Sequence, residues 1–111
     1  MTDFQIATLM RIFVDEGDRF GKRPLFMAIV DELEASGFAG ATVLKGIEGY
    51  GSHREVHAIR SVDFSTNLPV LIEVAETDDR IRSIIPRLQE MIPEGLITLE
   101  KMRMRLVRPN E

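Results

Sequence analysis

The sequence predicts an α+β fold in which four strands and two helices follow the order β-α-β-β-α-β. Two amphipathic helical patterns, one from Pro24 to Gly37 and one from Thr77 to Pro93, separate short runs rich in β-branched and aromatic residues. Strands divided by two helices in this way form the ferredoxin-like pattern. Right-handed crossovers then place both helices on one face of an antiparallel sheet.

The composition is that of one globular domain. The 111 residues are 44% hydrophobic and 29% charged, so we expect a single domain over 1–111 with a core over about 7–107 and a mobile loop over about 51–66. The net charge of −4 argues against a nucleic-acid partner. Without cysteine, disulfides, thiolate metal sites and cysteine nucleophiles are excluded. The longest apolar run (25–30) is too short to insert in a membrane and no secretory signal is evident, so we expect a cytoplasmic protein.

The first strand and the first helix are predicted from alternation and from a four-residue repeat. Residues 7–14 have an apolar face at even positions, and an opposite face at Leu9, Arg11 and Phe13. Pro24 suits the first helical position, where its missing N–H costs nothing. An apolar stripe follows at Leu25, Ile29 and Leu33. Gly37 is a natural C-terminal stop.

The middle of the chain predicts two strands around a polar segment. Residues 41–48 form the second strand, which breaks off in the glycine-rich "GIEGYG". Residues 52–69 are mostly polar, with an alternating stretch "HAIRSVDF" that can pair weakly. Residues 70–76 form the third strand, because an apolar side chain recurs at every second position.

The last third predicts the second helix and the fourth strand. Thr77 is a good N-cap, and the helical stripe consists of Ile81, Ile84, Ile85, Leu88 and Met91. In the strand over 96–107, apolar residues occupy odd positions up to Leu99 and even positions from Met102. Because a strand cannot change faces without an extra residue, we expect a bulge or break near residues 100–101.

The face of the sheet opposite the helices has nothing in the chain to cover it. It carries Leu9, Phe13 and Leu71, with Ile47 as a fourth candidate. Each large apolar side chain left exposed forgoes roughly 1.5–3 kcal/mol, and such patches usually mark interfaces. We therefore expect a homo-oligomer that packs through these open faces.

Two stretches, "AGATVLKGIEGYG" at 39–51 and "LPVLIEVAET" at 68–77, resemble the domain-of-unknown-function (DUF) 190 proteins. These belong to the PII-like (nitrogen regulatory protein-like) superfamily of small signalling proteins. The resemblance extends from Leu9 to Leu106 with the same order of elements. It implies a homotrimer of ferredoxin-like subunits whose sheets pack inward.

The resemblance also implies nucleotide sites in the clefts between subunits. Gly49, Tyr50 and Gly51 are similar to a glycine-aromatic-glycine at the base of the loop after strand two. Arg103 and Arg105 resemble alternating arginines that contact nucleotide phosphates. The phosphate cradle is incomplete, because "IPEGL" replaces a glycine-lysine-rich turn and the basic residue after the glycines is displaced to Arg54.

The leading hypothesis is a PII-like regulatory trimer that binds a small anionic ligand between subunits. The candidate ligand is an adenine nucleotide, ATP, ADP or AMP. The candidate binding residues are Gly49, Tyr50, Gly51, Arg54, Arg103 and Arg105. Binding would order residues 52–66 and so control a partner, for which the resemblance implies a membrane transporter or channel.

Other interpretations remain open. His53 and His57 are four residues apart, and a trimer of the cation-tolerance type can pool ligands from three subunits to hold a divalent metal. Alternatively, the histidines are ordinary loop residues, the arginines pair with Glu100, Glu73 or another subunit on a solvated strand face, and the protein is a ligand-free structural adaptor. No nucleophile and base stand at a spacing that predicts catalysis, so we do not expect an enzyme.

Overall fold

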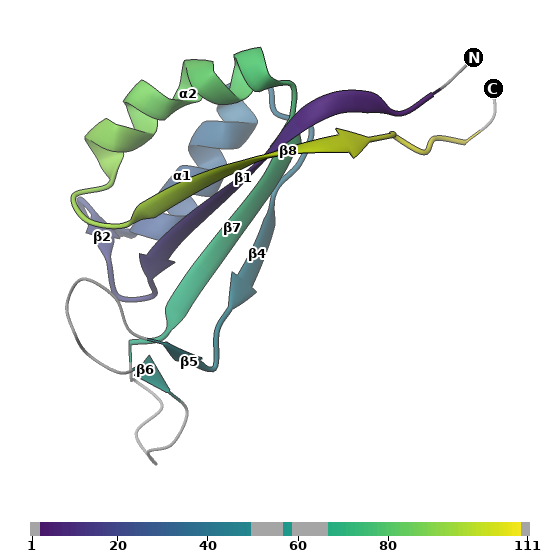
Figure 1. Ribbon diagram of the computed structural model, residues 1–111. Helices are drawn as coiled ribbons and strands as arrows, with labels where there is room; N and C mark the ends of the chain where they lie inside the picture. Colours follow the sequence, from purple (N-terminus) through teal and green to yellow (C-terminus); the bar gives the residue numbers. More distant parts are fainter. Residues whose placement is uncertain (1–2, 50–56, 59–66, 110–111) are drawn as a thin grey trace.

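The structure, a computed structural model, describes residues 3–49, 57–58 and 67–109. A four-stranded antiparallel sheet in the order β4-β7-β1-β8 carries both helices on one face (Figure 1). Its strands are β1 (Gln5–Asp15), β4 (Thr42–Lys45), β7 (Pro69–Glu76) and β8 (Leu96–Met104). The helices are α1 (Leu25–Ala35) and α2 (Asp78–Met91). Two-residue strands form two further pairs: β2 (Arg19–Phe20) with β3 (Arg23–Pro24), and β5 (Glu48–Gly49) with β6 (His57–Ala58). The predicted α+β, ferredoxin-like fold is confirmed.

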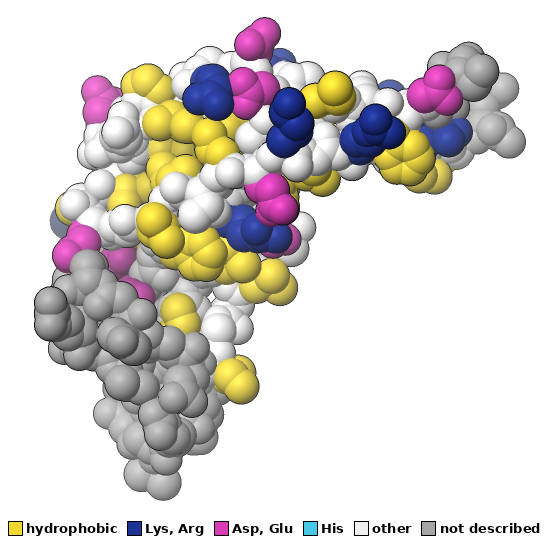
Figure 2. Space-filling model, viewed as in Figure 1, with side chains coloured by type: hydrophobic (Ala, Val, Ile, Leu, Met, Phe, Trp, Pro, Cys, Tyr) yellow, Lys and Arg dark blue, Asp and Glu magenta, His cyan; other side chains and the backbone are white. Residues whose placement is uncertain are grey.

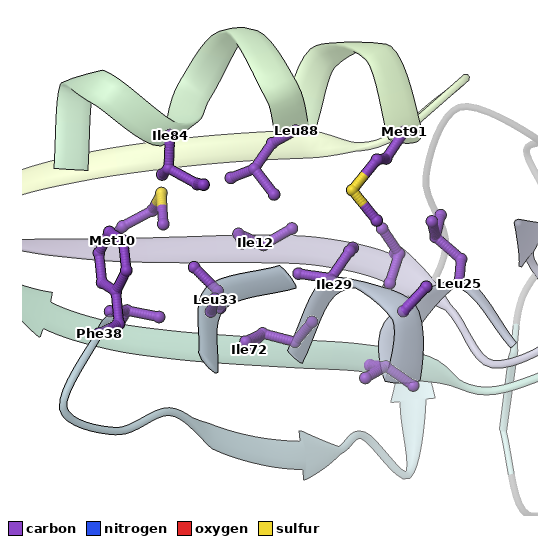
Figure 3. Close-up of a cluster of buried hydrophobic side chains, with 14 of the residues drawn as sticks. Met10, Ile12, Leu25, Ile29, Leu33, Phe38, Ile72, Ile84, Leu88 and Met91 are labelled. Carbon is purple, nitrogen blue, oxygen red and sulfur yellow. The ribbon is translucent and has the colours of Figure 1, made fainter. Parts of the chain in front are cut away.

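The core lies between the sheet and the two helices (Figure 3). Alternate residues of β1 and β7 point into it, from Met10 to Val14 and from Val70 to Val74, and Met10, Ile12 and Ile72 are fully buried. Each helix supplies the stripe that its periodicity predicts, and its buried members are Leu25, Ile29, Leu33, Ile81, Ile84, Leu88 and Met91. Burial of such a side chain contributes roughly 1.5–3 kcal/mol, so these stripes hold the helices on the sheet.

The first helix ends in a Schellman motif. Gly37 has a φ of 86°, the left-handed conformation that glycine adopts without a Cβ penalty. The Phe38 N–H donates to the Leu33 carbonyl and the Gly37 N–H to the Glu34 carbonyl, each over 3.1 Å. Gly37 thus ends α1 as predicted. The start differs by one residue, because Pro24 is the N-cap and the helix begins at Leu25.

The second strand is shorter than the 41–48 predicted. β4 ends at Lys45, and Gly46 turns the chain out of the sheet. A Cβ on Gly46 would lie 2.8 Å from Cγ of Pro69, so only glycine fits this close approach without displacement. The weakly alternating stretch after it contributes two residues, His57 and Ala58, which pair with Glu48 and Gly49.

The prediction of a bulge or break near residues 100–101 is wrong. β8 pairs with β1 in one unbroken register, from Gln5 opposite Met104 to Phe13 opposite Leu96. Leu99 lies opposite Met10 on the helix side, whereas Met102 lies opposite Ala7 on the open side. The strand therefore keeps its faces throughout, and its apolar residues move from one face to the other where the helical layer ends (Figure 1).

The open face carries the side chains that the sequence predicts, with one exchange. Leu9, Phe13 and Leu71 alternate with core residues and so face away from the helices. On β4 the corresponding residue is Leu44, which lies opposite Leu71 and is 48% exposed. Ile47, which the sequence offers as a fourth candidate for this face, lies beyond the end of β4. The face remains uncovered within the described part of the chain.

The left-handed conformation of Gly37 predicts that Gly37→Ala destabilises the fold. Forcing a Cβ into this conformation costs about 1–2 kcal/mol, so the free energy of unfolding in urea should fall by that amount. Gly40→Ala is the control, because no atom lies within 4 Å of its Cβ position and its φ is not left-handed. An equal loss in both variants would show that the helix stop does not depend on Gly37.

Candidate functional site

The glycine-rich end of the candidate site lies where the chain leaves the sheet after β4. Gly49 belongs to β5 and stands opposite His57 of β6 in the two-residue ladder. Tyr50, Gly51, His53 and Arg54 lie outside the described residues, as does the expected loop over 51–66 apart from His57 and Ala58. The structure therefore places the backbone of two predicted residues, Gly49 and His57, side by side.

The two ends of the segment between β4 and β7 are fixed to each other and to the turn after β1. The Gly46 N–H donates to the Pro69 carbonyl over 2.7 Å. The Glu16 N–H donates to the Leu68 carbonyl over 2.7 Å, and the Glu16 carboxylate accepts from Nζ of Lys45 over 2.6 Å. The start of the glycine-rich stretch, at the end of β4, is therefore anchored both to β7 and to the turn after β1.

The two arginines lie at the other end of the sheet. Arg103 is opposite Ile6, near the start of β1. Lys45, at the end of β4, is joined through Val70 to Val14, near the end of β1. Ile6 and Val14 are eight positions apart, which separates the two ends by about 27 Å of extended strand. Within one chain, Gly49 and Arg103 are too far apart to hold the same small ligand.

Arg103 is exposed on the helix side of the sheet, opposite the methionines of the same strand, as predicted. Its guanidinium makes no hydrogen bond or ion pair with any residue that the structure describes. Arg105 follows directly after β8 and is exposed. Arg103 is thus a cation available to a ligand or to another chain.

An ion-pair network that the sequence does not reveal lies at the centre of the open face. Nε of Arg11 donates to Glu73 over 2.9 Å, and Nη1 of Arg11 donates to Glu100 over 3.2 Å. The hydrogen bond with Glu73, supported by that with Glu100, raises the pKa of Arg11. The cross-strand register of Arg11 and Glu73 creates this network. Only pairing the strands in their correct register could have found it.

Apolar side chains surround this network. On the open face they come from all four strands: Leu44, Leu71, Leu9, Phe13, Leu96, Met102 and Met104. Figure 2 shows hydrophobic side chains over the body of the sheet and again along the extension that carries both termini. An exposed apolar surface of this extent is typical of a contact with another protein chain.

A second polar cluster lies at the start of α2. Oγ1 of buried Thr8 donates to Oδ1 of Asp78 over 2.7 Å, and Nε of Arg82 donates to Oδ2 over 2.7 Å. The hydrogen bond from Thr8, followed by that from Arg82, lowers the pKa of Asp78. A depression of about 310 Å³ adjoins this cluster and is also lined by Lys101. Both oxygens of Asp78 are occupied, so its evident role is to fix α2 on β1.

The described residues give no metal centre. No three histidine, aspartate or glutamate side chains among residues 3–49 and 67–109 lie close enough together to hold an ion. The candidate ligand His53 falls outside the described residues, and only the backbone of His57 is placed. In the same part of the chain, neither helix is long and apolar enough to cross a membrane.

The chain matches one family of known sequences and has curated relatives in other microorganisms. Residues 7–104 match the model of the DUF190 family, described as "Uncharacterized ACR". A UPF0166 protein of Methanocaldococcus jannaschii is 38% identical over 94 residues, which cover 84% of this chain and 86% of that protein. A UPF0166 protein of Aquifex aeolicus is 30% identical over 92 residues, covering 83% and 87%.

Solved structures share the fold. CPII from Thiomonas intermedia K12, a nitrogen regulatory PII-like protein bound to ADP, AMP and bicarbonate, has a TM-score of 0.72 at 13% identity and covers 94% of this chain and 92% of its own. A candidate PII-like signalling protein of Thermus thermophilus has a TM-score of 0.63 at 24% identity, with coverage of 95% and 93%. At these identities the similarity establishes the PII-like fold alone.

The Thr8 hydrogen bond predicts an acid-dependent contribution to stability. Because the pKa of Asp78 is lower in the folded state, its contribution is present above the unfolded pKa and is lost as pH falls through the folded pKa. Thr8→Val should raise the pKa of Asp78 toward its ordinary value, measured by NMR titration of its carboxyl carbon. Thr77→Val is the matched control, since the Thr77 side chain makes no capping hydrogen bond. An unchanged titration in Thr8→Val would refute this assignment.

Proposed function

The chain belongs to the DUF190 family, and on that basis we propose that it is a PII-like regulatory protein that assembles as a homotrimer and binds an adenine nucleotide between its subunits. In this proposal the protein binds its ligand and catalyses no reaction. Nucleotide occupancy would be read by a partner, such as a membrane transporter or channel, through the segment between β4 and β7.

The observation that carries this proposal is the separation of Gly49, which lies beyond the end of β4, from Arg103, which lies near the opposite end of the sheet. A ligand that uses both residues needs them from two different chains. The open face gives the chains a reason to associate, because burial of its partly exposed leucine and phenylalanine side chains gains roughly 25 cal/mol for each Å² of apolar surface removed from water. Assembly and ligand binding then depend on each other.

Adenine nucleotides fit the chemistry of the candidate residues. Arginine binds phosphate oxygens through charge-assisted hydrogen bonds, and Arg103 has no competing partner among the described residues. Glycines let backbone N–H groups approach an anion closely, which favours the stretch around Gly49 as the second half of the site. CPII, which shares the fold, is described as bound to ADP, AMP and bicarbonate.

The trimer can be tested by size-exclusion chromatography with light scattering. We expect three times the chain mass at micromolar concentration, and we expect Phe13→Asp on the open face to give monomers, because it would bury a charge in the interface. Met27→Asp is the control, since Met27 is 48% exposed on α1. A wild-type protein that is only monomeric would exclude the trimer.

Nucleotide binding can be tested by isothermal calorimetry against ATP, ADP, AMP and cyclic nucleotides. Loss of a charge-assisted hydrogen bond is worth about 1.5–3 kcal/mol, so Arg103→Ala should weaken binding by roughly 10-fold or more. Arg87→Ala removes the same charge from α2, where Arg87 pairs with Glu32 of α1, and should bind as wild type does. If no nucleotide binds more tightly than about a millimolar, the nucleotide proposal fails.

A further inference from the structure

The helix side of the sheet has a depression where α2 begins. Its volume is about 310 Å³, at the lower end of the range of roughly 300–1,000 Å³ that is typical of small-molecule sites. Asp78 joins the first turn of α2 to Thr8 of β1, and beyond that level no helix covers β1 and β8 (Figure 1). The depression therefore lies where the helical layer ends, and one chain supplies its whole lining.

Part of the lining is apolar. Ile6 of β1 and Leu99 of β8 both contribute to it, and strand register directs both side chains to the helix side of the sheet. Ile6 is 67% exposed. Thr8 lies between them, but its hydroxyl is buried and donates to Asp78. This part of the depression therefore suits an apolar group of a ligand.

Two cations line the same depression, Arg82 of α2 and Lys101 of β8. Lys101 lies opposite Thr8, so its side chain is on the helix side. Nε of Arg82 donates to Asp78, whereas the two terminal nitrogens of Arg82 and Nζ of Lys101 have no hydrogen-bond partner among the residues that the structure describes. The Arg82 side chain is 65% exposed, so these donors are accessible to a ligand.

The charges at the depression favour an anion. Glu100 contributes to the lining, but its carboxylate accepts from Arg11 on the open face. Of the side chains that line the helix side, one carboxylate, Asp78, therefore stands against two cations. Arg103 follows Lys101 on the same side of β8. Figure 2 shows Lys and Arg side chains spaced from α2 along the extension that carries both termini.

We propose that this depression binds a small organic anion, whose phosphate or carboxylate group lies between Arg82 and Lys101 and whose apolar part contacts the apolar lining. Charge-assisted hydrogen bonds from arginine and lysine are the strong contacts of such groups. Arg82 can bind the anion and still hold Asp78, because Nε alone is engaged there. The site goes beyond the proposed nucleotide function, since it needs no second chain.

Phenyl phosphate is a suitable probe, because it joins a phosphate to an apolar ring. We expect saturable shifts of the backbone amide signals of Thr8, Asp78 and Lys101 in NMR titrations, with a Kd below about 10 mM. Inorganic phosphate, which lacks the ring, and benzamide, which lacks the charge, should each bind more weakly. Lys101→Ala and Arg82→Ala should each weaken binding of phenyl phosphate about 10-fold, through loss of a charge-assisted hydrogen bond.

A matched control separates this site from a general effect of charge. Arg19→Ala removes one cation from β2, beyond the other end of β1, and should bind phenyl phosphate as wild type does. Lys101 and Arg82 are exposed, so circular dichroism and the urea midpoint of their variants should match wild type. Equal weakening in Arg19→Ala and Lys101→Ala would overturn the site, because binding would then follow net charge alone.

A further variant separates the site from the proposed nucleotide site. Phe13→Asp on the open face, which we expect to be monomeric, should lose nucleotide binding and keep phenyl phosphate binding, because the depression belongs to one chain. Loss of phenyl phosphate binding in Phe13→Asp would overturn the inference. Absence of saturable shifts in the wild-type protein would also overturn it and would leave the nucleotide proposal standing. Binding of phenyl phosphate without any nucleotide binding would support the depression and reject the nucleotide proposal.

Discussion

The structure depends on the unbroken antiparallel register of β1 with its two neighbours, β7 and β8. Because side chains alternate along a strand, this register assigns every residue of three strands to one face. It directs Met10 and Ile12 into the core and Arg11 and Phe13 to the open face. A shift by one position would exchange the two faces, so the core and the candidate interface are set by the same pairing.

The helical layer is shorter than the sheet that it covers (Figure 1). Asp78 begins α2 at the level of Thr8, and the strand residues beyond that level have no helix above them. Position Leu99 of β8 is therefore covered, whereas position Arg103 on the same face is not. Because of this difference in length, the start of β1 and the end of β8 project beyond the helices (Figure 1). On its helix side, β8 is therefore apolar where a helix covers it and basic where none does.

Local periodicity predicted both helices and the strands of the core, because their apolar stripes are continuous in sequence. The bulge prediction failed because it assumed that one face is covered along all of β8. The Thr8–Asp78 pair was not foreseeable from spacing, since tertiary packing joins residues 70 positions apart. Motif reasoning selected Gly49 and Arg103 but could not give their separation, which follows from strand order.

The joined ends of the segment between β4 and β7 have an evolutionary consequence. The Gly46–Pro69 hydrogen bond and the Lys45–Glu16 ion pair fix where the chain departs and returns, whatever lies between. Closing a longer loop between fixed ends costs little, about 0.6 kcal/mol for each doubling of its length. Insertions and deletions there can therefore accumulate without disturbing the sheet. Such a position lets one scaffold acquire new loop sequences while its sheet and core stay the same.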